Sequence, residues 1–202
     1  LAIDEAAYGK EHPEVATDAN NLGMILEAEG ARDEARALYG RALRIWEARG
    51  GASHPAVATG LNNLAGLEQR SGNLGVARAH YERALAIREA SLGADHPETA
   101  QALNNLASVL AAGGDYPKAA GLYQQAIDRL SSALGAHHPA VAATLESLAG
   151  LRALQGDAKN AVALFTRALQ ATEDHVRTLS AGFGSRQRLA AQRSTRYRLD
   201  NW

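Results

Sequence analysis

A histidine followed by proline recurs along the chain, and histidine is a common ligand of zinc and other metal ions. The dipeptides stand at a constant step of 42 residues, beginning at His12, His54, His96 and His138. Metal ligands must converge within about 2 Å of one ion, whereas equivalent loops of stacked helix pairs lie on the order of 15–20 Å apart. The spacing therefore predicts no metal site and no cofactor, and it favours histidines that cap their loops.

Asparagine pairs form a second recurring pattern, at residues 20–21, 62–63 and 104–105. An asparagine amide carries both a donor and an acceptor, which can pair with the N–H and C=O groups of an extended peptide. Asparagine is also a poor residue for a helix interior, so packing gives little reason to place six of them there. The alternative is that one asparagine of each pair bonds to the backbone of the neighbouring repeat and holds the stack together.

Composition and motifs exclude several other classes of function. The chain has no Cys, 21 Lys+Arg against 22 Asp+Glu, and a net charge of −1. This balance argues against a chain-wide nucleic-acid surface, and no G-x-S-x-G, P-loop or paired-carboxylate motif indicates an enzyme or a small-molecule substrate. No apolar run approaches the roughly 20 residues of a membrane span. Together with the absence of Cys, this favours a cytoplasmic protein.

Elements that could position these side chains follow from the same 42-residue period. Together with His-Pro, six registers keep this step, as in Leu22, Leu64, Leu106 and Leu148, or Tyr39, Tyr81, Tyr123 and Phe165. Within one unit, apolar residues at helical spacing predict a first helix over residues 55–70 and a second that stops near Leu92-Gly93. Asn73, Asp115 and Asp157 stand where a side-chain oxygen caps the second helix. The aromatic residue at the Tyr39 register of each unit is expected to fill the gap between neighbours.

The second unit carries the residues of a known repeat. Its residues Leu61, Leu64, Ala65, Gly72, Ala77, Tyr81 and Ala84 match the consensus spacing of the tetratricopeptide repeat. The 42-residue step, longer than the usual repeat of about 34, resembles the kinesin-light-chain subtype. The resemblance implies an all-α, right-handed superhelix of about four helix-turn-helix repeats plus a C-terminal helix. The chain departs from the family pattern at the late aromatic position of the first helix, where Glu68 and Arg152 stand, and looser packing is expected there.

In this family the inner faces of the first helices line a concave groove, so the resemblance implies where a peptide would bind. Lysine is absent from this face, which argues against a lysine-based carboxylate clamp. The peptide-contacting residues predicted on the face are Asn20, Asn21, Met24, Thr59, Asn62, Asn63, Gln101, Asn104, Asn105 and Ser108.

The period also predicts the division of the chain. Residues 1–11 align with the end of a preceding repeat, so an apolar N-terminal face that frays or self-associates is expected. Residues 181–202 are expected to form a linker and a basic helix that begins at Ser185. The string from Ser185 to Asp200 is similar to the segment that joins such repeats to a CHAT domain, a caspase-like peptidase. A capping helix or a nucleic-acid arm are the other interpretations. The four repeats between these ends are 12–53, 54–95, 96–137 and 138–180.

The function that these patterns favour is non-catalytic recognition of a protein or peptide, with no membrane involved and with nucleic acid disfavoured as a partner. A regulatory arm of a CHAT-type peptidase and a structural or self-assembly spacer are the alternatives.

Overall fold

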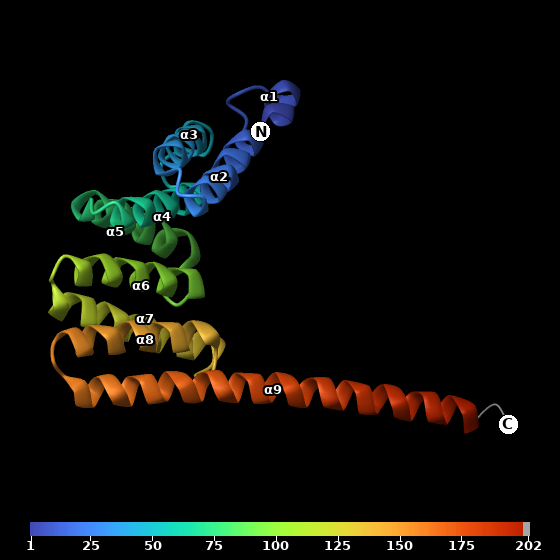
Figure 1. Ribbon diagram of the computed structural model, residues 1–202. Helices are drawn as coiled ribbons and strands as arrows, with labels where there is room; N and C mark the ends of the chain where they lie inside the picture. The colour runs from blue at the N-terminus through green and yellow to red at the C-terminus, as the bar shows by residue number, and fades with distance from the viewer. Residues whose placement is uncertain (200–202) are drawn as a thin grey trace. The chain divides into compact units, whose positions relative to one another are not determined.

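The computed structural model describes the backbone of residues 1–199 and the side chains of residues 1–180. Within this part of the chain every regular element is an α-helix (Figure 1). The helices are α1 (Ala2–Tyr8), α2 (Pro13–Ala28), α3 (Arg32–Gly50), α4 (Pro55–Arg70), α5 (Leu74–Leu92), α6 (Pro97–Ala112), α7 (Tyr116–Leu134), α8 (Pro139–Leu154) and α9 (Ala158–Leu199).

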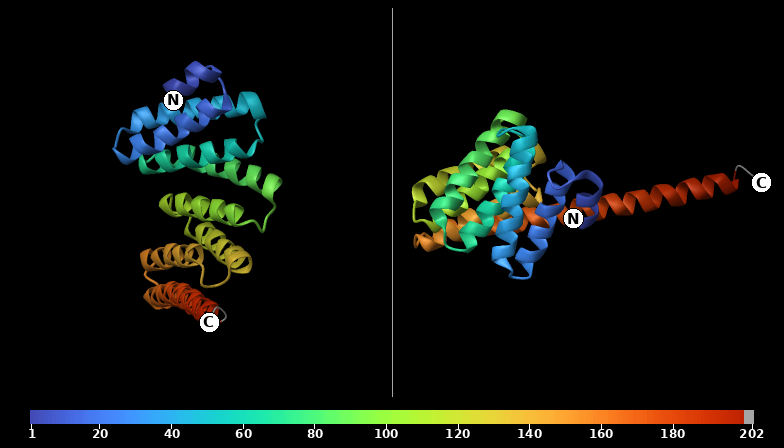
Figure 2. Two further views of the ribbon diagram at one scale, coloured as in Figure 1. Left: turned by 90° about the vertical axis from the view of Figure 1, so that its right-hand side faces the viewer. Right: turned by 90° about the horizontal axis from the view of Figure 1, so that it is seen from above.

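The chain divides into two compact units, Leu1–Arg129 and Leu130–Trp202, and the boundary falls within α7. In the first unit, α2 packs on α3 and α4 packs on α5, and the two pairs meet where α3 packs on α4 (Figure 2). Helix α5 packs in turn on α6. In the second unit, α8 packs on α9. The fold is therefore the all-α repeat of helix pairs that the 42-residue period predicts.

Each first helix begins in the same way. Proline occupies its first turn, where a missing N–H costs nothing. The preceding histidine is the N-cap, and its Nδ1 accepts the N–H two residues ahead, as His54 does from Ala56 at 3.2 Å. The same bond recurs at His12, His96 and His138. The four histidines thus cap helices, which confirms the loop-capping interpretation.

Caps of the second helices agree with the sequence only in part. Asp115 and Asp157 accept N–H bonds from Lys118 and Asn160, as predicted. Asn73 makes no capping bond, and its amide donates to Glu68 instead at 2.5 Å. The prediction for Asn73 is therefore wrong, because a buried carboxylate nearby takes the side chain away from the helix end.

The core combines large aliphatic side chains, such as Leu61 and Leu145, with small residues and a tyrosine ring at fixed registers of the repeat. Ala35, Ala77 and Ala119 are fully buried, and Tyr39, Tyr81 and Tyr123 lie at most 6% exposed. Small side chains let the helices approach closely, and each tyrosine ring fills the space between them. Phe165 occupies the same register but is 46% exposed, so the prediction that it fills such a gap is wrong. Phe165 lies in α9, which packs on α8, and this packing leaves nearly half of the residue exposed.

Arginine side chains tie successive second helices together across the loops. Arg83 in α5 pairs with Glu47 in α3 at 2.7 Å and donates to the carbonyl oxygen of Ala52 at 3.1 Å. Arg41 makes the same two contacts with Glu5 and the carbonyl of Lys10. Arg129 repeats them with Glu89 and the carbonyl of Ala94. We call this arrangement of arginine, glutamate and loop carbonyl a loop tie.

Helix α9 differs from the sequence expectation. Its backbone runs without a break through residues 181–184, where we expected a linker, and past Ser185, where we expected a new helix to start. No proline stands in this stretch, and a glycine in a helix costs about 1 kcal/mol relative to alanine without removing a hydrogen bond. The arginine side chains of the C-terminal string, and the CHAT-like resemblance that rests on them, lie outside the described side chains. Within the described residues, no helix combines the length and apolar character of a membrane span.

Candidate functional site

The first unit contains a hollow of about 500 Å³ on the faces of α2, α4 and α6 that carry the asparagine pairs. Four of the predicted contact residues line it: Met24, Asn62, Asn63 and Asn105. Asn20 lies deeper, at 5% exposure, and Asn21, Thr59 and Gln101 are exposed outside the hollow. Asn104 and Ser108 are partly buried and also lie outside it. The structure therefore places four of the predicted contact residues in one hollow centred on α4, and the other six lie outside its lining.

Two side-chain hydrogen bonds join the asparagine pairs of successive repeats. The Nδ2 of Asn63 donates to the Oδ1 of Asn20 at 2.9 Å, and the Nδ2 of Asn105 donates to the Oδ1 of Asn62 at 2.6 Å. In each case the second asparagine of one pair reaches the first asparagine of the preceding pair. Stacking therefore uses asparagine side chains on both sides, rather than the backbone that the alternative interpretation named.

These bonds use only one of the two polar atoms in the amides of Asn62 and Asn63, which line the hollow. Asn62 uses its oxygen and Asn63 uses its nitrogen. Over the described residues, no hydrogen bond engages the Nδ2 of Asn62 or the Oδ1 of Asn63. One donor and one acceptor on adjacent residues thus remain available in the wall of the hollow.

Further along the row the amides are more fully used. The Oδ1 of Asn105 accepts from Gln101 at 3.2 Å and from Asn104 at 3.5 Å. Ser108 accepts a hydrogen bond from Gln69 in α4 at 2.9 Å. The Oδ1 of Asn104 is buried with no hydrogen-bond partner among the described residues. Gln101 and Ser108 therefore support neighbouring side chains in this structure.

A charged pair in the hollow was missed by the sequence prediction. Arg70 at the end of α4 donates to Glu27 of α2, and the hydroxyl of Tyr39 donates to the other oxygen of Glu27 at 2.9 Å. Burial raises the pKa of Tyr39, and the bond to Glu27 raises it further. Gly66 forms part of the wall, and a Cβ there would lie 3.3 Å from the Arg70 guanidinium. The available signal was the four-residue step from Gly66 to Arg70, which places both on one helix face.

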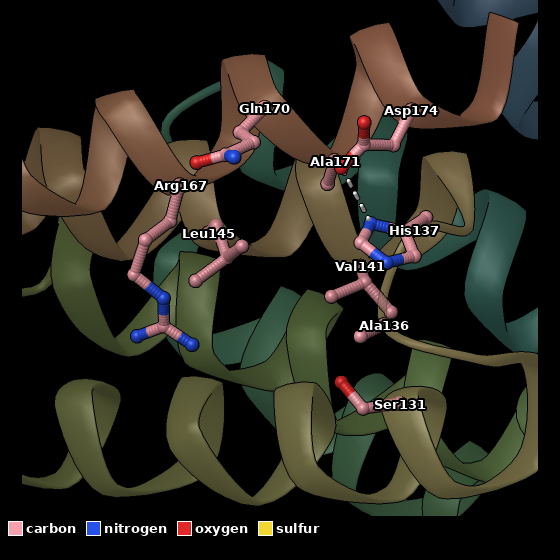
Figure 3. A pocket seen from close by; sticks show the side chains of 9 residues that line it. All are labelled: Ser131, Ala136, His137, Val141, Leu145, Arg167, Gln170, Ala171 and Asp174. Atoms are coloured by element: carbon pink, nitrogen blue, oxygen red, sulfur yellow. Dashed lines mark ion pairs between the residues drawn. The ribbon is translucent and has the colours of Figure 1, made fainter. Parts of the chain in front are cut away.

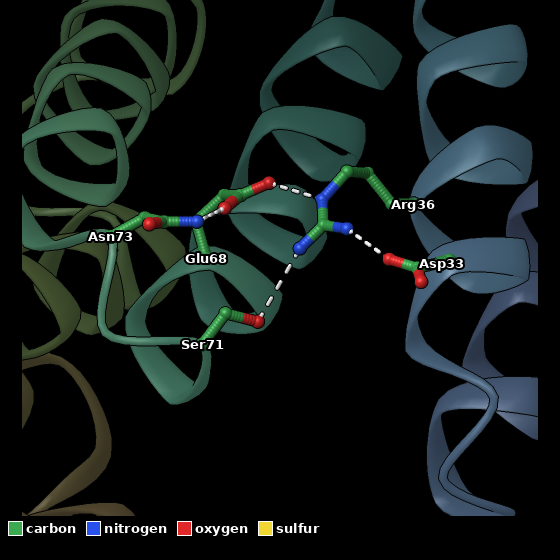
Figure 4. Close-up of polar contacts among 5 residues, drawn as sticks. All are labelled: Asp33, Arg36, Glu68, Ser71 and Asn73. Carbon is green, nitrogen blue, oxygen red and sulfur yellow. Dashed lines mark hydrogen bonds and ion pairs between the residues drawn. The ribbon is translucent and has the colours of Figure 1, made fainter.

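A second polar cluster lies at the ends of α3 and α4 (Figure 4). Glu68, only 6% exposed, accepts from Arg36 at 2.7 Å and from Asn73 at 2.5 Å. Burial by itself raises the pKa of Glu68, but these two hydrogen bonds and the charges of Arg36 and His80 outweigh it and lower the pKa from 4.5. The expectation of looser packing at Glu68 is wrong, because a bonded carboxylate occupies the aromatic position.

The comparisons with known proteins agree with this architecture. The family model of the tetratricopeptide repeat matches residues 1–48, 19–90, 56–132 and 114–174. No curated protein matches the chain. Among solved structures, BtubC (BKLC) from P. vanneervenii superposes with a TM-score of 0.73 at 23% identity, over 81% of this chain and 66% of that one.

Two further structures resemble the chain. A protein of the kinesin light chain type from Podosopora anserina, with nearly identical TPR-like repeats, has a TM-score of 0.70 at 24% identity, covering 86% of this chain and 82% of its own. MamA has a TM-score of 0.59 at 18% identity, covering 83% of this chain and 84% of its own. These similarities show a shared fold, and the family model covers most of the sequence. The chain belongs to the tetratricopeptide repeat family, and its structural neighbours include kinesin-light-chain-like members.

Proposed function

We propose that this chain is a non-catalytic recognition module that binds an extended peptide segment of a partner protein in the hollow on α4. The tetratricopeptide fold supports protein interaction in general. The observation that carries the finer proposal is the pair of half-used amides, Asn62 and Asn63, which face a hollow of about 500 Å³.

The two amides complement a peptide backbone. The Nδ2 of Asn62 donates to a carbonyl of the bound segment, and the Oδ1 of Asn63 accepts one of its N–H groups. An extended peptide presents both groups along one edge, whereas a helix uses them internally. Each such bond contributes only about 0.5–1.5 kcal/mol net. Contacts in the rest of the hollow are therefore needed for useful affinity.

Space for a ligand side chain comes from the hollow of about 500 Å³ that Gly66 helps to line. A Cβ at Gly66 would lie 3.3 Å from the Arg70 guanidinium and 3.5 Å from the hydroxyl of Tyr81, so a larger residue there would crowd these two side chains. Met24 adds a flexible apolar contact on the α2 side. The hollow thus combines backbone-pairing groups with room for one side chain.

The test separates the ligand-facing half of an amide from its structural half. Asn62→Asp keeps the oxygen that accepts from Asn105 but removes the free donor, so the stack should hold while peptide binding weakens about tenfold. Peptides selected from a random extended library on the native chain are the probe, with fluorescence anisotropy as the measurement. Asn21→Asp adds the same charge at an exposed position outside the hollow and should leave affinity unchanged.

Each remaining outcome counts against the proposal. Equal peptide affinity in Asn62→Asp and the native chain would show that the Nδ2 of Asn62 does not contact the peptide. A loss of helicity or of melting temperature in Asn62→Asp would instead assign the amide to the stack.

A further inference from the structure

The second unit holds an arginine that stands where a loop tie is expected, without its glutamate. Arg167 in α9 has the register of Arg41, three repeats earlier in the chain, and of Arg83, two repeats earlier. The partner register holds Glu5, Glu47 and Glu89 in the earlier repeats but Ser131 in this one. A serine hydroxyl carries no charge and is too short to replace a glutamate side chain. The fourth tie therefore lacks its anion.

A hollow lies at the position where the other loop ties have their glutamate. This hollow of about 190 Å³ is lined by Ser131 at the end of α7, by Val141 and Leu145 of α8, and by Arg167 and Gln170 of α9. Figure 3 shows the Arg167 side chain reaching from α9 towards the helix that carries Ser131. Within residues 1–180, no ion pair or hydrogen bond engages the guanidinium of Arg167. The hydroxyl of Ser131 is likewise without a partner among the side chains described.

Asp174, the one carboxylate that lines this hollow, is engaged elsewhere. It lies 3.4 Å from the Nδ1 of His137 and 3.4 Å from the guanidinium of Arg177. Figure 3 shows the His137 contact at the opposite end of the hollow from the Arg167 guanidinium. Asp174 therefore does not substitute for the glutamate of the tie.

We propose that this hollow binds the carboxylate of a glutamate side chain presented by a partner protein, in the place that Glu5, Glu47 and Glu89 occupy in the other loop ties. Arg167 supplies the charge and a planar pair of donors, which suits a carboxylate. Ser131 and Gln170 supply further donors. Val141 and Leu145 form an apolar wall for the methylene groups of the side chain. The site shares no residue with the hollow on α4 and does not depend on the peptide-binding proposal.

The test introduces a carboxylate of the chain itself into the hollow. Ser131→Glu restores the residue of the other ties, so it should pair with Arg167 and prevent an external carboxylate from binding. Ser132→Glu is the matched control, because it adds the same charge at the neighbouring exposed position that does not line the hollow. Arg167→Gln removes the cation and keeps a polar side chain.

The probe is glutamate blocked as its N-acetyl and N-methylamide derivative, titrated into the full chain while NMR follows the Nε–H of Arg167. We expect a saturable shift that the blocked glutamine derivative does not produce. Affinity should fall about tenfold or more in Arg167→Gln and in Ser131→Glu, with Ser132→Glu like the native chain. In Arg167→Gln the backbone amide of Ser131 replaces the lost reporter.

Several outcomes would overturn the inference. One is a shift with the glutamine derivative equal to that with the glutamate derivative, and another is unchanged affinity in Ser131→Glu. A third is an equal loss of affinity in Ser132→Glu and Ser131→Glu, which would show that any added negative charge has the same effect. Inorganic phosphate is titrated in parallel. Tighter binding of phosphate than of the glutamate derivative would assign the hollow to phosphoryl groups and reject the glutamate side chain as its occupant.

Discussion

Glu68 shows how one side chain can take a position that the repeat normally gives to an aromatic ring. It is buried between α3 and α4 and is held by Arg36 and by Asn73. Arg36 also bonds to Asp33 and to Ser71 (Figure 4). A buried carboxylate is costly unless its oxygens are bonded, and both oxygens of Glu68 are. The cluster therefore joins two repeats through polar contacts at a place where family members use apolar packing.

Acid should weaken this cluster in a defined direction. The folded pKa of Glu68 lies below its ordinary value of 4.5, so its stabilisation is complete above pH 4.5 and is lost as the pH falls through the lowered pKa. Glu68→Gln should cost about 1–3 kcal/mol of unfolding free energy at pH 7, and the difference from the native chain should shrink below pH 4.5. Urea unfolding at several pH values measures it.

The control is Glu82→Gln, which breaks an exposed pair with Arg78 on one helix face. Such pairs are worth about 0.3–0.5 kcal/mol. A difference between Glu68→Gln and the native chain that persists undiminished at pH 3 would contradict the pKa argument.

At the scale of the helix, two glycines that stand in adjacent registers of the repeat, Gly23 and Gly150, have different roles. Gly23 in α2 lies against the ring of Tyr39, and a Cβ there would come within 2.8 Å of it. The equivalent residues in later repeats are Ala65, Ala107 and Ala149. Gly150 in α8 has no atom within 4 Å of its Cβ position. The first glycine is required by packing, and the second only weakens its helix.

These two positions should therefore respond oppositely to the same change. Gly23→Ala should destabilise the chain by about 1–3 kcal/mol, because the fully buried Tyr39 ring has little freedom to move. Gly150→Ala should stabilise it by about 0.5–1 kcal/mol through helix propensity. Thermal unfolding of the two variants side by side measures both signs. A Gly23→Ala variant as stable as the native chain would show that the Tyr39 ring can move to make room for the added methyl group.

Across the whole molecule, stability is expected to be local, because each repeat contacts only its neighbours. Helix α1 has no buried residue, whereas α4 buries residues along its whole length, from Val57 to Glu68. The pair between Glu5 of α1 and Arg41 of α3 is one of the polar contacts that hold this helix. Helix α1 should thus open without disturbing the rest of the first unit.

Native-state hydrogen exchange tests this difference. We expect the amides of α1 to exchange on the order of a hundredfold faster than those of α4, since they open in local events and not in global unfolding. Equal protection of the two helices would mean that the whole first unit unfolds as one cooperative block.

The sequence alone determined the helix pairs of the four repeats, although not the continuous helix α9. A step of 42 residues, proline after each capping histidine and small residues at fixed registers are local signals, and they predicted the helix pairs and their starting points. The asparagine pairs were also visible as chemistry. The sequence did not show whether the oxygen or the nitrogen of each amide is free to contact a ligand, because that depends on which atom bonds to the neighbouring repeat.

Only the tertiary structure decided the contacts between repeats. Asn20 bonds to Asn63, Glu68 to Arg36, and Glu27 to Arg70, and each pair is separated by more than 30 residues in the chain. Hydrogen bonds and ion pairs act over a few ångströms, so small differences in how helices stack choose the partners. For the same reason, the unpaired Arg167 could be recognised only after the tied arginines of the other repeats were seen in place.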